Sequence, residues 1–323
     1  MLAVELLISD PSGKGAFAPV VEGEAVWTTE RVGAAGKLVF VINDSGKSDF
    51  SEGSAVRFKY DGRGVFFGYV FTKKRKKEGS VTVTAYDGLR YLKNRDTYIY
   101  ENKTASQLVK MIAGDYGLTL GTVDKSDVVI SYRIEENTTL FDMIENALEL
   151  TLQGGGERFV LFDDFGKLSL RKISSMYVGE NGSYFLIDEG TGENFEYVSS
   201  IDGGSYNRIK LVYNDKKTGK REAYIAQDKA NISKWGMLQY FGHLSKGENG
   251  QAKAKSLLEL YNKENRRLKL INVFGDTRVR AGSVIAVRLE LGRERLNKFM
   301  LVDRAVHRFG PDGHFMDLIL NLM

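Results

Sequence analysis

Two pairs of residues in the sequence have side chains that could do chemistry. Asp163 and Asp164 are adjacent carboxylates, the residue type that glycosidases use for general acid and base catalysis. His307 and His314 flank the turn sequence Gly310–Gly313, so they could face one another across a hairpin. Imidazole nitrogens are common ligands of zinc. The sequence therefore raises two possible sites, an acid/base pair and a metal site.

Neither pair is complete by itself. Adjacent side chains in a turn point apart, whereas the two carboxylates of a glycosidase come from separate elements and flank the scissile bond. A zinc site needs a third and a fourth ligand, and Asp303 and Asp317 are the candidates nearest in sequence to the histidines. We therefore expect the two aspartates to form a turn and the two histidines to form a structural pair.

Other short motifs favour structural roles. Asp164–Gly166 has the letters of the magnesium-binding triplet of protein kinases, but the catalytic-loop motif and the glycine loop of a kinase are missing. Gly62–Gly64 lacks the third glycine of a dinucleotide-binding loop and joins two predicted strands. Trp27 and Trp235 are more typical of core or interface anchors than of ligand platforms. The sequence predicts no catalytic, cofactor or metal site, and we expect no enzyme.

The composition narrows the class of protein further. A chain of 323 residues exceeds the size at which one hydrophobic core usually keeps growing, so at least two domains are expected. The lack of cysteine excludes a disulfide framework, a thiolate nucleophile and a thiolate-bound metal. No apolar run approaches the roughly 20 residues of a membrane helix. The segment Met1–Ile8 contains Glu5 and has no basic region before it, so we expect no signal peptide and folding in a cytoplasm.

A run of consecutive basic residues accounts for the net charge of +4. The run consists of Lys73, Lys74, Arg75, Lys76 and Lys77. It lies between two predicted strands, and we interpret it as the solvated tip of a hairpin, with docking on an acidic neighbour as the alternative. Proteins that bind single-stranded nucleic acid interleave aromatic residues for base stacking, and this run has none.

Alternation of apolar and polar residues predicts two series of antiparallel strands. The first series is Leu38–Ile42, Ala55–Tyr60, Val65–Phe71 and Val81–Tyr86; the second is Tyr206–Tyr213, Leu268–Phe274, Ser283–Leu289, Lys298–His307 and His314–Leu322. A further hairpin, Arg158–Phe162 with Lys167–Arg171, lies between them, and one helix ending near Tyr261 interrupts the second series.

Two helices are predicted between the strand series. Thr104 with Gln107, and Thr139 with Asp142, have the spacing of an N-cap hydroxyl and a polar side chain that reaches back to it. The glycines of Gly154–Gly156 end the second helix. The same threonines complete Asn-x-Thr glycosylation sequons, but without a secretory signal we interpret them as helix caps.

The fold class that follows is a β-rich α+β multidomain protein with two antiparallel β-barrel domains. Residues 1–98 are expected to form the first barrel and residues 99–175 an α/β module with two helices and a hairpin. Residues 176–323 are expected to form the second barrel, with a helical insertion at about 214–266. Boundaries of this kind follow from turn and glycine-rich segments between periodic ones.

Several motifs, taken in order, resemble the XkdQ/YqbQ family of PBSX-like prophage tail proteins. They are Tyr86–Leu92, Asn102–Thr104, Asp164–Leu168, Trp235–Gln239, Val279–Ser283, Val306–Arg308 and His314–Leu318. The ordered set is more specific than any one motif, and the similarity covers nearly the whole chain. The chain is therefore identified as similar to this family.

The resemblance implies a structural baseplate hub subunit of a contractile tail, in a phage, a defective prophage or a phage-tail-like bacteriocin. Such hubs resemble the trunk of secretion-system spike proteins, and their two tail-tube-like barrels let a homotrimer present six barrels in a ring. The ring would join the hexameric tail tube to a trimeric spike. The implied partners are the tail tube protein, the spike protein and peripheral baseplate proteins, with assembly in the bacterial cytoplasm, no cofactor, and the basic run as one docking loop.

Two other functions stay open at this point. A tail-associated carbohydrate-binding or cell-wall-degrading protein would need a carboxylate pair or an added lytic domain, and the sequence gives no convincing pair. A barrel that binds single-stranded nucleic acid would show steep salt dependence, and no specific binding of nucleic acid is expected here.

Overall fold

The computed structural model describes residues 4–10, 15–43, 50–180, 182–191, 194–214, 219–244, 247–291 and 294–323. Of the opening segment Met1–Ile8, the first three residues lie outside the described residues. In the described part of the chain, no helix combines the length and apolar character needed to cross a membrane. Strands dominate, as the sequence predicts.

The N-terminal strands form an antiparallel sheet in the order β3-β4-β7-β6-β5-β1-β2. They are β1 (Val4–Ser9), β2 (Ala16–Phe17), β3 (Val21–Glu30), β4 (Lys37–Asn43), β5 (Ala55–Tyr60), β6 (Arg63–Arg75) and β7 (Ser80–Tyr86). The first predicted series is confirmed as β4 to β7, and its alternation buries Phe40, Phe58 and Val83 in one core. Asp61 and Gly62, with φ of 51° and 73°, form the two-residue turn between β5 and β6.

The α/β module follows the first sheet. Its elements are the short 3-10 helix η1 (Gly88–Lys93), β8 (Arg95–Thr104), α1 (Ala105–Asp115), β9 (Leu120–Val123), β10 (Val129–Thr139), α2 (Leu140–Gln153), β11 (Phe159–Asp163), β12 (Leu168–Lys172) and a second 3-10 helix, η2 (Ile173–Ser175). The two N-caps are confirmed: Thr104 accepts a hydrogen bond from the Gln107 amide and Thr139 one from the Asp142 amide. The apolar faces of α1 and α2 meet in the core of the module.

The C-terminal strands extend the first sheet. They are β15 (Leu186–Ile187), β16 (Asn194–Ser200), β20 (Asn265–Phe274), β21 (Val284–Leu291), β22 (Glu294–Gly310) and β23 (Gly313–Leu322). Before them, β13 (Gly179–Glu180) and β14 (Ser183–Tyr184) pair with each other in a two-stranded sheet of their own. β22 pairs with β3, so Trp27 lies opposite His307 and strands from both ends of the chain share one 13-stranded sheet. The hydrogen-bonded path among the described strands does not close on itself.

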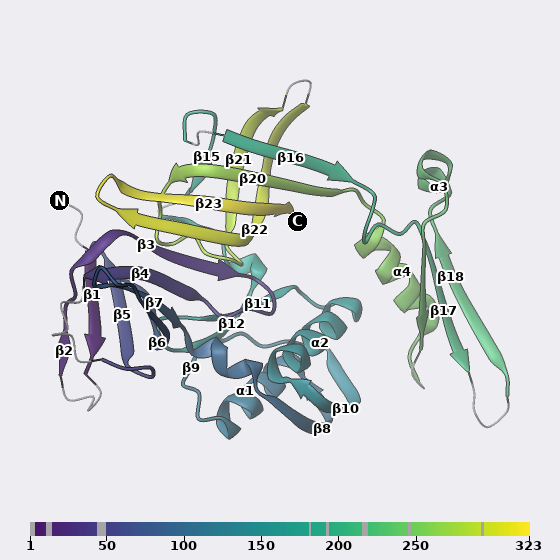
Figure 1. Cartoon of the computed structure of the whole chain (residues 1–323). Coiled ribbons are helices and arrows are strands. Elements are labelled where there is room, and N and C mark those ends of the chain that lie inside the picture. Colours follow the sequence, from purple (N-terminus) through teal and green to yellow (C-terminus); the bar gives the residue numbers. More distant parts are fainter. Residues whose placement is uncertain are drawn as a thin grey trace.

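The insertion module projects from this body (Figure 1). It comprises β17 (Arg208–Asn214), β18 (Arg221–Gln227), α3 (Lys229–Trp235), β19 (Gln239–His243) and α4 (Gly250–Tyr261). The predicted helix ending near Tyr261 is confirmed as α4, and α3 was not predicted.

One strand assignment was wrong. Tyr206–Tyr213 was expected in the second barrel, but the strand there, β17, pairs with β18 and β19 in a sheet of its own. Its inward residues Ile209 and Leu211 pack against Ala254 and Leu257 of α4. An alternating pattern indicates a half-buried strand without revealing which sheet it joins.

Candidate interaction surfaces and the joint between modules

His307 and His314 form a buried pair, as the sequence predicts. They lie on the hairpin of β22 and β23, and His307 Nδ1 is 2.9 Å from His314 Nε2. His307 Nε2 is 3.0 Å from the Val279 carbonyl oxygen, which can only accept a hydrogen bond. His307 therefore donates to Val279 through Nε2 and accepts from His314 at Nδ1. Burial favours the neutral form of both rings.

The proposed metal ligands are engaged elsewhere. Asp303 receives a hydrogen bond of 2.8 Å from Arg31 Nε, and Asp317 pairs with Arg308. In the part of the chain that the structure describes, no group of three or more metal-binding side chains comes together. The histidine pair is placed to join β22, β23 and the loop at Val279, which is a structural role.

Asp163 is the last residue of β11, and Asp164 begins the predicted turn to β12. Asp163 is buried and accepts hydrogen bonds from the amides of Gly88 and Gly166, at 3.2 and 2.6 Å. Phe165, with a φ of 50°, reaches over Gly64 of the first sheet, where a Cβ would lie only 2.8 Å from its ring. Asp164–Gly166 and Gly62–Gly64, which resemble nucleotide-binding motifs only in their letters, therefore touch each other and dock the α/β module on the first sheet.

A buried charge cluster joins three parts of the chain. Asp87 follows β7, Asp163 ends β11, and Arg280 lies in the loop before β21. Asp87 accepts hydrogen bonds from the amides of Gly36 and Leu89 at 2.9 and 3.1 Å. Arg280 donates to the Asp163 carbonyl at 3.0 Å. The first sheet, the α/β module and the C-terminal strands thus meet at one ionic joint.

Burial shifts the pKa values of the two carboxyl groups in the joint. It raises the pKa of Asp163 to about 6 and that of Asp87 well above its usual range, and the charge of Arg280 opposes both shifts. The Arg280 guanidinium carbon lies 4.0 Å from the centre of the Phe162 ring, and the Nε atom has no hydrogen-bond partner among the described residues. Sequence reasoning missed this joint because its members are far apart in the chain and each stands in an ordinary turn.

The basic run lies on a hairpin, as predicted, but only partly at its tip. Lys73, Lys74 and Arg75 are the last residues of β6, and Lys76 and Lys77 lead into the turn. Lys73 Nζ donates to the Phe50 carbonyl at 2.7 Å and lies 4.7 Å from the centre of the Phe50 ring. Lys73 therefore anchors the hairpin, while the other four residues are exposed.

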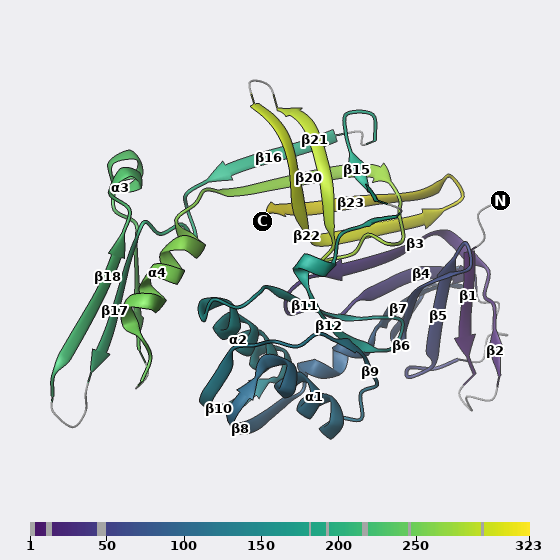
Figure 2. The ribbon, with the colours of Figure 1, turned by 180° about the vertical axis from the view of Figure 1, so that it is seen from behind.

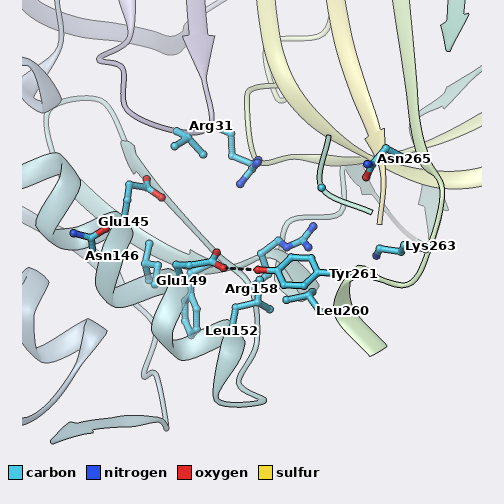
Figure 3. A pocket seen from close by; sticks show the side chains of 14 residues that line it. Arg31, Glu145, Asn146, Glu149, Leu152, Arg158, Leu260, Tyr261, Lys263 and Asn265 are labelled. Carbon is cyan, nitrogen blue, oxygen red and sulfur yellow. Dashed lines mark hydrogen bonds between the residues drawn. The ribbon is translucent and has the colours of Figure 1, made fainter. Parts of the chain in front are cut away.

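A polar cleft of about 470 Å³ lies between α2 and the end of α4 (Figure 3). The Tyr261 hydroxyl donates a hydrogen bond of 2.9 Å to Glu149 across it. Burial raises the pKa of Glu145 to about 7 and lowers the pKa of Arg158 and of Lys263. Arg31 of the first sheet also lines the cleft, which therefore marks the place where the insertion module meets the body.

One exposed apolar surface has no counterpart in the sequence analysis. Ile99 lies opposite Ile134 in the two-stranded sheet of β8 and β10, and both are more than half exposed, as is Tyr132. The helices α1 and α2 cover the other face of this sheet. A strand with apolar residues on both faces is the signal that could have revealed this surface.

A family model and two related proteins of known sequence point to the same family. A model of the YQBQ-like family matches residues 25–321. The chain is 31% identical over 277 residues to the uncharacterized protein YqbQ of Bacillus subtilis, covering 83% of this chain and 81% of the relative. It is 30% identical over 276 residues to the phage-like element PBSX protein XkdQ of the same organism, with the same coverage.

Solved structures share the fold over the whole chain. The 43 kDa tail protein of prophage MuSo2 from Shewanella oneidensis superposes with a TM-score of 0.68 at 13% identity, over 98% of this chain and 96% of that chain. The E. coli c3393 protein, a component of the type VI secretion system, superposes with a TM-score of 0.58 at 12% identity, over 98% of this chain and 76% of that chain. The chain belongs to the YQBQ-like family and has the fold of prophage tail proteins.

Proposed function

We propose that this chain is the baseplate hub subunit of a contractile phage tail or a phage-tail-like particle. In the particle it forms a homotrimer that joins the hexameric tail tube to a trimeric spike. The observation that carries the proposal is the fold match over 98% of the chain, both to a prophage tail protein and to the type VI secretion component c3393. The latter is itself described as similar in structure to the phage T4 tail proteins gp27 and gp5.

The arrangement of strands supports a ring with pseudo-sixfold symmetry. Two groups of antiparallel strands, one from each end of the chain, are joined edge to edge through β3 and β22. We propose that each group is one barrel-like unit, so that three copies present six such units. In the trimer, neighbouring copies cover strand edges and apolar faces that a single copy exposes, such as the surface at Ile99 and Ile134.

The proposed role is structural and needs no catalysis. Asp163 is enclosed in the joint, where backbone amides and Arg280 surround it, and its carboxylate is engaged in holding the modules together. The joint ties three modules into one unit that can carry force between tube and spike. We propose assembly in the bacterial cytoplasm and residence in the tail particle.

The exposed part of the basic run is proposed as a docking site for an acidic neighbour in the particle. Lys74, Arg75, Lys76 and Lys77 are exposed at one end of the β6–β7 hairpin. Charged residues at the edge of an interface mainly steer association and select partners. Peripheral baseplate proteins, the tube protein and the spike protein are the candidate partners.

Imaging of the native particle by cryo-electron microscopy tests the function. The expected result is density for three copies in a ring on the tail axis, between tube and spike. Density only at the outer periphery, or a particle that lacks this chain, would overturn the hub assignment. Hydrolysis of cell walls by the purified chain would favour the lytic function instead.

A further inference from the structure

The insertion module presents one sheet face away from the body. Its three strands lie in the order β18-β17-β19, and α4 packs against one side of them. Figures 1 and 2 show α4 on the side of the module that faces the body and the strands β17 and β18 on the far side. The opposite face of the sheet is therefore directed outward.

The strand register identifies the residues on this outward face, because directly paired residues point to the same side of a sheet. Lys210 lies opposite both Ile225 and Phe241. One pair of residues along, Val212 lies opposite Ala223 and His243, and at the other end Arg208 lies opposite Gln227 and Gln239. Val212 is buried, so the accessible part of the outward face consists of Ile225 and Phe241 on either side of Lys210, with Arg208 beside them.

Three large apolar side chains are exposed on this face or at its border. The exposed fraction is 40% for Ile225, 46% for Phe241 and 56% for Met237. None is needed for the core of the module, which α4 completes from the other side with Ala254 and Leu257. Exposed aromatic and methionine side chains beside a half-buried arginine are the composition of a protein interface.

The cations of the face lack acidic partners among the described residues. Among the described residues, the Arg208 guanidinium makes one polar side-chain contact, of 3.8 Å from Nη1 to the Met237 sulfur, a weak acceptor, and its Nε atom is buried without a hydrogen bond. The side-chain ammonium of Lys210 makes no hydrogen bond or ion pair with any described residue. The outward positions of all three strands carry no carboxylate. A carboxylate of a partner that pairs with the Arg208 Nη atoms or with the Lys210 ammonium would supply the acidic partner that these cations lack.

We propose that the outward face of the insertion module, centred on Lys210 and Phe241, binds an acidic segment of another protein component of the tail particle. This inference rests on the proposed function, and it assigns the insertion module the task of holding a peripheral partner. The apolar centre favours a protein over nucleic acid, because phosphate binding relies on a continuous basic surface. A carboxylate paired with Arg208 or Lys210, and apolar side chains on Phe241 and Ile225, would fill the face.

A zero-length cross-link in native particles tests the contact directly. A carbodiimide couples a carboxylate to a lysine amine only when the two are in contact. We expect a cross-linked peptide that joins Lys210 to an aspartate or glutamate of a different protein, identified by mass spectrometry. Lys210→Arg keeps the charge but cannot form the amide, so it should abolish this cross-link while the partner stays in the particle. Recovery of the same cross-linked mass from Lys210→Arg particles would overturn the assignment to Lys210.

A charge reversal separates this inference from the hub function. Arg208→Glu with Lys210→Glu should lower the copy number of the peripheral protein on the order of tenfold, because each lost charge pair becomes a repulsion. The chain itself should still occupy the ring. Lys229→Glu with Lys255→Glu makes the same charge change at exposed positions elsewhere in the module and should leave the copy number unchanged. Equal thermal unfolding of the purified variants excludes misfolding.

The two failures are distinguishable by imaging. A complete ring with a bare outward face, or a face covered by nucleic acid or lipid, would overturn the inference and leave the hub function standing. A particle in which the chain is absent from the axis would overturn the hub function instead.

Discussion

His314 Nε2 donates a hydrogen bond of 2.9 Å to His307 Nδ1, and this direction is fixed by the carbonyl of Val279 on the other side of the His307 ring. Burial lowers the pKa of His307 to about 3 and that of His314 to about 4; the charge of a protonated His314 further lowers the pKa of His307, and the charge of Asp276 opposes both shifts. The pair stacks near Trp27 and Phe309, where the N-terminal and C-terminal strands meet. Protonation of the pair would therefore weaken the connection between the two halves.

The histidine pair predicts a loss of stability in acid. In the unfolded chain the pKa of each ring is about 6.5. Between about pH 4 and 6.5 the unfolded chain therefore binds more protons than the folded chain, and stability falls as the pH falls. His314→Gln keeps a donor for His307 but removes one titrating ring. The slope of the unfolding free energy against pH should then drop by up to about 1.4 kcal/mol per pH unit, measured by urea unfolding. The exposed His243 is the control, and an equal slope for His314→Gln and the unchanged protein would contradict the prediction.

The close approach of Gly275 to the pair gives a second prediction. A Cβ on Gly275 would lie 2.2 Å from Cγ of His314, so Gly275→Ala should displace the ring and cost on the order of 1–3 kcal/mol of unfolding free energy. Gly114 in α1 has open space around its Cα. Gly114→Ala should therefore stabilise the protein by about 0.5–1 kcal/mol. Thermal unfolding of both variants checks this, and similar melting temperatures would contradict it.

The sequence predicted local structure better than it predicted long-range assembly. The caps at Thr104 and Thr139 and the pairing of His307 with His314 depend on residues close together in the chain, so spacing alone was sufficient. The joint of Asp87 with Arg280, and the place of β17 in a separate sheet, depend on contacts between distant segments. Hydrophobic periodicity does not contain that information.

Removal of Arg280 should destabilise the joint strongly. Arg280→Met would leave Asp87 and Asp163 buried without their cation, a change that typically costs about 3–5 kcal/mol. Without the cation, the pKa of each carboxyl in the folded state would rise further above its unfolded value. At low pH both carboxyls are protonated and neutral, so their burial costs little. As the pH rises through the folded pKa, the buried carboxyls must ionise and stability is lost. The loss should be larger at about pH 8 than at about pH 5.

Arg288 is the matched control for Arg280. It is exposed and lies 3.6 Å from Asp188, a surface pair whose loss through Arg288→Met should cost at most about 1 kcal/mol. Urea unfolding of both variants at the two pH values gives the comparison. A loss for Arg280→Met that is small, or greater in acid, would rule out a charge-based role for the joint.

The hydrogen bond from Tyr261 to Glu149 predicts how firmly the insertion module is held. It links α4 to α2 across the cleft, and burial followed by the charge of Glu149 raises the pKa of Tyr261. Tyr261→Phe removes the bond, worth about 0.5–1.5 kcal/mol, so amide exchange in α4 should quicken by about two- to tenfold while β20–β23 stay unchanged. Tyr240→Phe is the control, since the Tyr240 ring stacks on Tyr261 without such a bond. Equal exchange in the two variants would contradict a tethering role.

The basic hairpin predicts an effect on assembly rather than on folding. Lys74→Glu, Lys76→Glu and Lys77→Glu change exposed side chains, so the unfolding free energy should stay within about 0.5 kcal/mol of its original value. If the hairpin docks on an acidic neighbour, the share of the chain recovered in assembled particles should fall at least about tenfold, because attraction becomes repulsion. Lys73 stays unchanged, because its contact with Phe50 holds the hairpin.

A control with the same total charge decides whether the position of the hairpin matters. Lys93→Glu, Lys110→Glu and Lys255→Glu also reverse three exposed charges, but on other elements. If both triple variants enter particles equally well, the run is only a solvated turn and the docking proposal fails. If only the hairpin variant is excluded, and lower ionic strength speeds incorporation of the unchanged chain, then electrostatic docking at this hairpin is the cause, because screening weakens exposed charge pairs.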